Sequence, residues 1–365
     1  FSFFTLSCSF FFFSYIFLVA DIDNDWILRC AARCERNCFA EGLFPLASKF
    51  NHSCHPNCVA HFDDATQTMI VRTISYVSKG TELNIFYLSE RKAHLPTDQR
   101  RSLLARKYDF SCGCSRCDVG MTADTAGVSR LTLLKRQRSE RLLEAMKCPL
   151  CVQQEESEEE GLVIPVDDHR NFGRQPMEGW WPCTTCKGET EESDMNNTLV
   201  ACYQCVNEVT SILPLPSNLD HGVVSSLLDQ IHTTTEWLNQ RLHVGHWLSC
   251  RLHDAAYEMT RTLSVRCRRY QELANLYEKA VTMCAIHARI CIMAWKPILP
   301  THSHMVGHLY QRAEEAINAE AGLLDSGTEE EISLRKEAME CGKLAYQVLS
   351  DICGLYGVVD FNKKF

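Results

Sequence analysis

The sequence predicts an α+β protein in which a β-rich part comes first and a helical part follows. Up to about residue 110, apolar and β-branched residues form short runs that are separated by turns. From about residue 223 to residue 355, apolar residues recur at the spacing of amphipathic helices. Closely spaced cysteines, which are typical of metal-bound segments, lie between the two parts. With 365 residues the chain is long enough for two or three domains.

The composition is that of an ordinary folded protein. Hydrophobic residues make up 45% and charged residues 23%, which excludes a disordered or collagen-like chain. The formal net charge of −9 argues against a general attraction to nucleic acid, and we expect no direct nucleic-acid binding. In a chain of this length, 21 cysteines favour zinc in a reducing compartment over a disulfide framework. We therefore expect the protein in the cytoplasm, the nucleus or both.

Residues 1–20 are almost entirely apolar and carry no charge. Their length suits a membrane span, but no Lys or Arg precedes Arg29 to set an orientation. A secretory signal would have a basic start and a small-residue cleavage site, and neither is present. We rank a mis-assigned gene start first, a true anchor second and a signal third. A membrane partner is expected only if this segment belongs to the protein.

Short strands and one helix are predicted within residues 25–111. Met69–Val77 is rich in β-branched residues and is followed by a turn at Ser78–Gly80. Glu82–Leu88 then alternates as a second strand. Thr97 is the expected N-cap of a helix over Asp98–Lys107.

The later segments are predicted to be mainly helical. Ser129–Met146 has a helical composition and a basic middle, which we interpret as a solvated face. From residue 216 to residue 365, we expect paired helices in a TPR-like superhelical domain. Pro297 and Pro300 interrupt this helical run.

Three C-x-x-C pairs punctuate the region between the two parts: Cys148/Cys151, Cys183/Cys186 and Cys202/Cys205. The first two pairs have the spacing of zinc knuckles and predict a ribbon-like second metal site. Because six thiolates exceed one tetrahedral centre, one pair is either unmetallated or a substitute for another. A thioredoxin-like redox role would need a βαβ context, which we do not find.

The most informative stretch is Asn51-His52-Ser53-Cys54-His55-Pro56-Asn57. A polar cluster beside a buried strand must satisfy its hydrogen bonds internally. The run Gly80-Thr81-Glu82-Leu83 leads to Tyr87, and Tyr108-Asp109-Phe110-Ser111-Cys112-Gly113-Cys114-Ser115-Arg116-Cys117 follows the predicted helix. In this order and spacing, the three motifs resemble those of the SET lysine methyltransferases. The last run, together with the helical tail, is most similar to the SET-and-MYND (SMYD) family.

The resemblance covers residues 26–118 well and the helical tail loosely. It implies the C-terminal part of a SET domain over residues 25–111 and a post-SET zinc segment over residues 112–120. A helix and a C-x-x-C linker would occupy residues 121–215, ahead of the TPR-like domain. Nothing before Asp25 resembles the family's MYND module or the first half of SET. We therefore expect a chain truncated at its N-terminus, with residues 1–24 unrelated to the family.

The family resemblance implies a protein-lysine N-methyltransferase that uses S-adenosyl-L-methionine. Its substrates would be lysine-containing proteins or peptides, histone tails among them. Methyl transfer requires a neutral amine in line with the sulfonium methyl group, so positioning carries much of the rate. A free lysine has a pKa of about 10.4, and an apolar channel beside the sulfonium favours its neutral form. The tyrosine implied to orient this amine is Tyr87. The alternative is a non-catalytic, zinc-stabilised protein-interaction module.

The resemblance also implies which residues contact the methyl donor: Asn37, Ser48, Phe50, Asn51, His52, Tyr108 and Phe110. Asn51 and His52 would hold the adenosine and amino-acid ends of the cofactor. Tyr108 and Phe110 would supply aromatic surface for the adenine and the lysine channel.

A structural zinc ion is expected beside this site. Zinc takes four tetrahedral ligands in structural sites, and Cys112, Cys114 and Cys117 supply three. By resemblance, the fourth ligand is Cys54. The ion would tie the post-SET segment to the cofactor loop and close the lysine channel.

Overall fold

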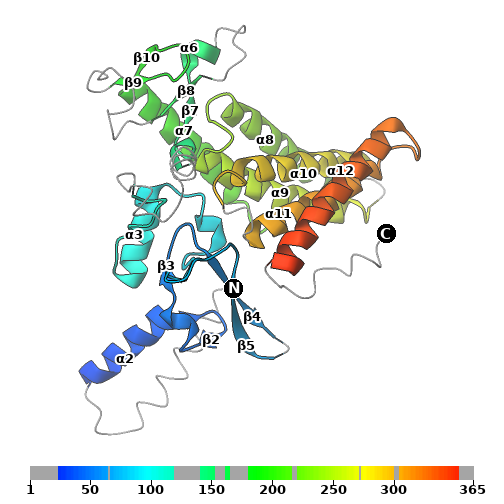
Figure 1. The fold of residues 1–365 in the computed structure, drawn as a ribbon. Coiled ribbons are helices and arrows are strands. Elements are labelled where there is room, and N and C mark those ends of the chain that lie inside the picture. Colours follow the sequence, from blue (N-terminus) through cyan, green and yellow to red (C-terminus); the bar gives the residue numbers. More distant parts are fainter. Residues whose placement is uncertain are drawn as a thin grey trace.

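The computed structural model describes residues 24–64, 66–118, 140–152, 161–164, 180–215, 220–270, 273–299 and 304–352. Figure 1 shows small strands and the helices α2 and α3 on one side of the molecule, and a group of longer helices on the other. The apolar residues 1–20 lie outside the described residues, and so do residues 129–139 of the predicted basic helix.

The strands of the N-terminal part pair two by two: β1 (Cys38–Phe39) with β2 (Gly42–Leu43), β4 (Cys58–Asp63) with β5 (Thr68–Thr73), and β3 (Asn51–His52) with β6 (Asn84–Ile85). The first two pairs are antiparallel, whereas β3 and β6 run parallel. The β3–β6 pair matters most for function because it joins two of the sequence motifs.

Both strands predicted in this part are shorter than expected. The predicted strand over Met69–Val77 is β5, which ends at Thr73, and the strand over Glu82–Leu88 is reduced to β6. Side chains replace a partner strand around β6. The Asn57 amide oxygen accepts from Asn84 N at 2.9 Å, and its Nδ2 donates to the Glu82 carbonyl at 2.9 Å. Because a side chain satisfies these backbone groups, the ladder does not extend.

Helix α2 (Asn24–Asn37) precedes the strands, two short 3₁₀ turns occupy Ala47–Lys49 and Glu90–Lys92, and α3 (Thr97–Tyr108) follows them. The prediction that Thr97 caps α3 is wrong, because Pro96 holds the N-cap position and Thr97 begins the helix. The Thr97 hydroxyl instead donates to Glu140 Oε1 at 2.8 Å. The helix ends at Tyr108, and its C-cap Asp109 has a left-handed φ of 63°.

A cysteine-rich module contains β7 (Met146–Lys147), α6 (Pro149–Val152), β8 (Leu162–Val163), β9 (Trp180–Pro182) and β10 (Glu189–Glu191). Strand β7 pairs with β8, and β9 pairs with β10. The predicted helix does not extend to Met146, which lies in β7. Lys147 N donates to the Arg241 carbonyl at 2.8 Å, so this strand is held against the helical region.

Six helices form the C-terminal region among the described residues: α7 (Glu192–Thr210), α8 (His221–Asn239), α9 (Trp247–Cys267), α10 (Ala274–Trp295), α11 (His304–Ala321) and α12 (Glu329–Tyr346). Along this series, α9 packs against α10, α10 against α11, and α11 against α12. Side chains of Asp220, His246 and Thr328 cap three of the helices. Helix α10 ends at Trp295, two residues before Pro297, as the sequence predicts.

Buried side chains join the parts of the molecule. Met146, Cys148 and Trp181 of the cysteine-rich module share one apolar cluster with helices α7 to α9. Ala93 and Leu143 share another with Trp295, whose ring centre lies 4.8 Å from that of His94. None of the described helices is long and apolar enough to cross a membrane.

Candidate active site and four-cysteine clusters

The parallel pair β3–β6 brings the Asn-His-Ser-Cys motif beside the Gly-x-Glu-Leu motif. Asn51 is in register with Asn84 and His52 with Ile85, and Ser53 N donates to the Ile85 carbonyl at 3.0 Å. Two motifs that lie about thirty residues apart in the sequence therefore share one short ladder, which fixes the position of Tyr87 two residues after β6.

Tyr87 is half-buried, and contacts at both ends orient it. Its hydroxyl donates to the Phe50 carbonyl at 2.5 Å, and its own carbonyl accepts from the Tyr108 hydroxyl at 3.2 Å. The rings of Tyr87 and Tyr108 lie 4.9 Å apart, and Phe110 meets Tyr87 edge-on at 6.4 Å. Burial, reinforced by Tyr108 and Glu82, raises the pKa of Tyr87, so its hydroxyl keeps its proton at neutral pH.

His52 lies between these aromatic rings and the cysteines. Its Nδ1 accepts from Tyr87 N at 3.0 Å, so in a neutral ring the proton is on Nε2, 3.2 Å from Cys54 Sγ. Its ring packs against Phe86 at 5.4 Å and Phe110 at 6.0 Å. Burial lowers the pKa of His52 to about 4, which keeps the ring neutral. A neutral ring can donate to sulfur through Nε2 while it holds the Tyr87 backbone through Nδ1.

The remaining predicted cofactor residues lie on different segments. Asn51 is exposed, and its Nδ2 donates to Glu82 Oε1 at 2.6 Å. The Ser48 hydroxyl donates to the Pro45 carbonyl at 3.1 Å, and Asn37 closes the end of α2 by donating to the Arg33 carbonyl at 2.7 Å. The structure thus joins Phe50, His52, Tyr108 and Phe110 around Tyr87, whereas these side-chain hydrogen bonds of Ser48 and Asn37 are local.

Cys54, Cys112, Cys114 and Cys117 converge beside His52, and their sulfurs all lie within 4.8 Å of one another. Cys54 Sγ is 3.9 Å from Cys112 Sγ and 3.5 Å from Cys117 Sγ. Thiolates on a tetrahedral zinc, each about 2.3 Å from the metal, are separated by about 3.8 Å. A disulfide would require about 2.05 Å. The spacing therefore fits a metal site and not a pair of disulfides.

Arg100 is fully buried against this cluster. Its Nε donates to Cys54 Sγ at 3.3 Å and its Nη2 donates to Cys117 Sγ at 3.2 Å. Glu140 accepts from Arg100 Nη1 at 2.6 Å and from Arg116 Nε at 2.5 Å. Burial lowers the pKa of Arg100, but the charges of Glu140 and the cysteines outweigh it and the net pKa is raised. The guanidinium is therefore a permanent positive charge beside the sulfurs.

Sequence reasoning missed Arg100, Arg116 and Glu140. One signal was available for the first of them. Arg100 lies one turn before Leu104 and two turns before Tyr108, on the face of α3 that turns toward the cysteines. An arginine in line with buried positions needs a buried partner.

The second predicted group, Cys148, Cys151, Cys183 and Cys186, also converges within 4.8 Å. The sulfurs of Cys148 and Cys186 lie 3.8 Å apart, and those of Cys151 and Cys183 lie 3.7 Å apart. Backbone N–H groups of Thr185 and Gly188 donate to Cys183 Sγ and Cys186 Sγ at 3.3 and 3.4 Å. Such donors favour thiolates over thiols. Figure 1 places this module next to the N-terminal end of α7.

Gly161 lies directly against the second group. A Cβ atom at this position would overlap Cys151 Sγ and lie 3.0 Å from Cys183 Sγ. Only glycine leaves room for both sulfurs. In contrast, Cys202 is fully buried in the apolar core on α7, and neither Cys202 nor Cys205 joins a four-cysteine group within the described residues.

Comparisons with known proteins identify a SET domain in this chain. The family model "SET domain" matches residues 8–88. The chain is similar to "Histone-lysine N-methyltransferase ASHR1" of Arabidopsis thaliana, at 41% identity over 76 residues, 21% of this chain and 15% of that protein. It is also similar to "Histone-lysine N-methyltransferase SMYD3" of Mus musculus, at 37% over 78 residues, 21% of this chain and 17% of that protein. A third similarity is to "Protein-lysine N-trimethyltransferase SMYD5" of Danio rerio, at 32% over 93 residues, 24% of this chain and 22% of that protein.

The chain carries a SET domain and is related to the SMYD methyltransferases. The alignments span between 15% and 22% of these three relatives, so the chain matches only a small part of their length. The family match begins at residue 8, inside the segment that we expected to be unrelated. The predicted N-terminal truncation, with its boundary near residue 24, is therefore not confirmed.

Proposed function

We propose that this chain is an S-adenosyl-L-methionine-dependent protein-lysine N-methyltransferase of SMYD type. The observation that carries the proposal is the placement of Tyr87. The β3–β6 ladder fixes its backbone, the Phe50 carbonyl fixes its hydroxyl, and Tyr108 and Phe110 flank its ring. A rigid tyrosine hydroxyl inside an aromatic enclosure is what alignment of an amine for methyl transfer requires.

S-adenosyl-L-methionine is the cofactor that a SET domain implies, and the residues near Tyr87 fit it. The exposed side chain of Asn51 offers an amide to polar groups of the ligand. The half-buried rings of Tyr108 and Phe110 offer aromatic surface to an adenine. When bound, the cofactor would supply a methyl group on a sulfonium centre. We assign the contacts to Asn51, His52, Phe50, Tyr108 and Phe110, with Ser48 and Asn37 at the edge of the site.

The residues of the chain then have separate tasks. Tyr87 keeps its proton, and because that proton is given to the Phe50 carbonyl, the oxygen lone pairs are free to accept from a lysine amine. His52 holds the Tyr87 backbone from the side of the cysteines. The aromatic walls exclude water and favour the neutral form of the amine, which is the form that attacks.

Zinc fits the first four-cysteine cluster by donor type and by sulfur spacing. The ion would hold the post-SET segment, and with it Tyr108 and Phe110, against Tyr87. Zinc fits the second cluster on the same grounds, with Gly161 leaving room for the sulfurs. There it would be a structural ion of a ribbon-like module.

The substrates, the location and the domain limits belong to the same proposal. Lysine-containing proteins or peptides, with histone tails as candidates, would enter from the side of Tyr87. The protein would act in the cytoplasm, the nucleus or both. The domains would be those of the resemblance, with the SET part up to residue 111, the post-SET segment over 112–120, the cysteine-containing linker over 121–215 and a TPR-like domain from 216.

Two measurements on the full chain test the proposal. Isothermal titration with S-adenosyl-L-methionine should show saturable binding that Asn51→Ala weakens and Tyr87→Phe retains. Transfer of a radiolabelled methyl group to core histones should be lost in Tyr87→Phe, because the ring stays and only the hydroxyl is removed. A folded chain that binds no cofactor and transfers no methyl group would favour the alternative, a zinc-stabilised interaction module.

A further inference from the structure

The two four-cysteine clusters differ in how far solvent reaches their sulfurs. In the second cluster, Cys186 is exposed and the other three cysteines are buried. In the first cluster, three cysteines are buried and the most accessible one, Cys114, is half-buried. The fully buried guanidinium of Arg100 also lies against the sulfurs of the first cluster. A reagent that comes from solvent therefore meets the sulfur of Cys186 before any other sulfur of the two clusters.

A tight turn holds Cys186 at the surface. Gly188 N donates to Cys186 Sγ at 3.4 Å, and Lys187 between them has a left-handed φ of 61°. The Lys187 ammonium donates to the Thr184 carbonyl at 2.5 Å, which closes the same turn. Figure 1 shows this module, with α6, β9 and β10, at one edge of the molecule. Access to Cys186 is therefore a property of the folded module.

A second sulfur lies beside Cys186. Cys148 Sγ is 3.8 Å from Cys186 Sγ and is buried. Its backbone is fixed, because Cys148 N donates to the Gly161 carbonyl at 2.8 Å. A sulfur that is accessible to oxidants and next to a second thiolate is the arrangement of redox-sensitive cysteines. The two sulfurs belong to different C-x-x-C pairs, so the arrangement differs from the thioredoxin-like exchange within one pair.

We propose that Cys186 is an oxidation site through which hydrogen peroxide releases zinc from the second cluster. The inference rests on the zinc ion proposed for that cluster. The Cys186 thiolate attacks one peroxide oxygen, so that an S–O bond forms and the O–O bond breaks, and the leaving hydroxide takes a proton from solvent. The Cys148 thiolate then attacks the Cys186 sulfur, so that an S–S bond forms and the S–O bond breaks, and this hydroxide is also protonated. Two electrons pass from the sulfurs to the peroxide, which becomes water, and the zinc ion loses two of its four ligands and dissociates.

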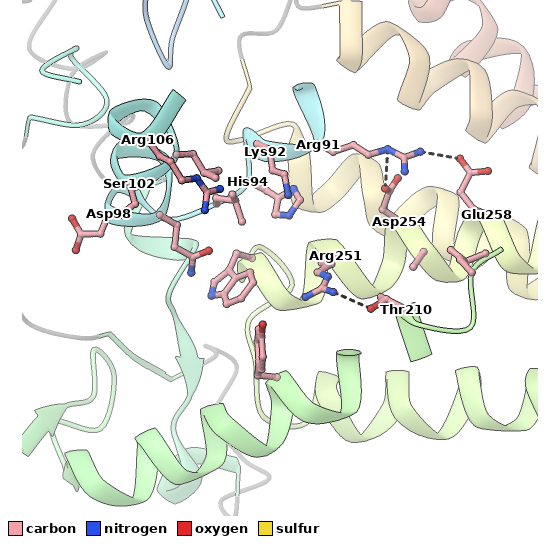
Figure 2. Close-up of a pocket in the computed structure, with 17 residues that line it drawn as sticks. Arg91, Lys92, His94, Asp98, Ser102, Arg106, Thr210, Arg251, Asp254 and Glu258 are labelled. Atoms are coloured by element: carbon pink, nitrogen blue, oxygen red, sulfur yellow. Dashed lines mark hydrogen bonds and ion pairs between the residues drawn. The ribbon is translucent and has the colours of Figure 1, made fainter. Parts of the chain in front are cut away.

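The effect of zinc release should be confined to the cysteine-rich module. Trp181 and Cys148 share an apolar cluster with α7 to α9, so the module would loosen where it meets these helices. Helix α7 also has a contact of its own with α9. Thr210 accepts from Arg251 at 3.0 Å beside a cavity of about 730 Å³, and Figure 2 shows this bond. We therefore expect the helical region to stay folded after oxidation.

Two readouts on the full chain test the proposal without measuring methyl transfer. The chain is freed of reductant and treated with hydrogen peroxide in the presence of a chromogenic zinc chelator. About one of about two zinc ions should be released. Peptide mapping by mass spectrometry should then find Cys148 joined to Cys186. Dithiothreitol with added zinc should restore the original zinc content, and the far-ultraviolet circular dichroism of the helices should stay the same throughout.

Two variants separate Cys186 from other exposed thiols. Cys186→His offers another ligand that zinc accepts in structural sites and that cannot form a disulfide. This variant should hold about two zinc ions and release zinc to the chelator in peroxide at least about tenfold more slowly than wild type. Cys38→Ser removes an exposed thiol outside both clusters and should release zinc at the wild-type rate. The disulfide map of the wild type needs no variant, so it decides the question if the histidine does not bind zinc.

The failure of this inference can be distinguished from the failure of the zinc assignment. A chain that holds zinc in both clusters and keeps it in peroxide would overturn the inference and leave the zinc assignment intact. Disulfides that form first among the cysteines of the first cluster would also overturn it, and so would a wild-type rate of release from zinc-loaded Cys186→His. A second cluster that holds no zinc before oxidation would contradict both proposals.

Discussion

Glu140 Oε1 accepts a 2.6 Å hydrogen bond from the guanidinium of Arg100, across 40 residues of sequence. Arg100 in turn donates to the sulfurs of Cys54 and Cys117. Eight residues after Glu140, Cys148 belongs to the second four-cysteine cluster. One short segment therefore connects the two clusters, and we expect a structural change at one cluster to affect the other.

The first prediction concerns the charge of Arg100. Four thiolates around a zinc ion carry a net charge of about −2, and the buried guanidinium offsets part of it. Arg100→Met keeps much of the volume and removes the charge. The variant should release zinc to a chelator at least about tenfold faster, because removing an outer-shell partner of a metal ligand weakens metal binding. Arg106→Gln, on the exposed face of the same helix, should release zinc at the wild-type rate. Equal rates for Arg100→Met and wild type would contradict a role in holding the ion.

The second prediction concerns Glu140. Without its negative charge, the guanidinium groups of Arg100 and Arg116 would be buried near each other with no carboxylate between them. Breaking a buried ion pair by removing one partner costs about 3–5 kcal/mol. Glu140→Gln keeps the shape and should lower the free energy of unfolding in urea by that order. Glu144→Gln, one turn further along, provides a comparison on the same segment. Unchanged unfolding of Glu140→Gln would show that the pair is not structurally important.

The sequence allowed the fold class and the cysteine groups to be predicted, because both depend on local pattern. Helical periodicity identified the region of α8 to α12, and cysteine spacing identified Cys148 with Cys151 and Cys183 with Cys186. The inclusion of Cys54 with the distant Cys112 came from the family resemblance, and the structure brings their sulfurs to 3.9 Å. That zinc occupies these groups is still a prediction.

What could not be predicted depends on partners that are distant in sequence. Nothing in the sequence around Thr97 shows that its hydroxyl bonds to Glu140 instead of capping α3. The short β6 is explained by the Asn57 side chain, which occupies positions that a strand would otherwise fill. Arg312, on α11, donates to Asp254 and Glu258 of α9, which lie 58 and 54 residues earlier in the sequence. Each of these needs the three-dimensional arrangement.

The third prediction counts metal ions. If both clusters hold zinc, the purified chain contains about two zinc ions from these sites. Cys151→Ser should lower the content by about one, and Gly161→Ala should do the same because its Cβ would overlap Cys151 Sγ. Cys202→Ser, in the core of α7, should leave the content unchanged. Atomic emission after gel filtration makes the measurement. A content that is the same in Cys151→Ser and wild type would contradict a second zinc site.

The fourth prediction concerns the pH dependence of stability. His246 is almost fully buried, and its Nδ1 caps α9 by accepting from Leu248 N at 3.1 Å. Burial, with His243 as a second cause, lowers the pKa of His246 to about 3. The unfolded chain, in which histidine has a pKa of about 6.5, therefore binds one more proton than the folded chain between about pH 6.5 and pH 3. The stability contributed by the neutral ring is complete above pH 6.5 and is lost as the pH falls.

The variant His246→Asn tests this dependence, because an asparagine side chain does not titrate and is a strong N-cap. The variant should still cap α9, and its unfolded chain should no longer bind the additional proton. Between about pH 4.5 and pH 6, its unfolding free energy should fall less steeply than that of the wild type, by up to about 1.4 kcal/mol per pH unit. His232→Asn, at an exposed position on α8, is the matched comparison. Because loss of zinc from thiolates also depends on pH, the difference in slope between the two variants is the quantity to measure. If the unfolding free energies of wild type and His246→Asn depended on pH in the same way across this range, His246 would titrate alike in the folded and unfolded states, and the prediction would be wrong.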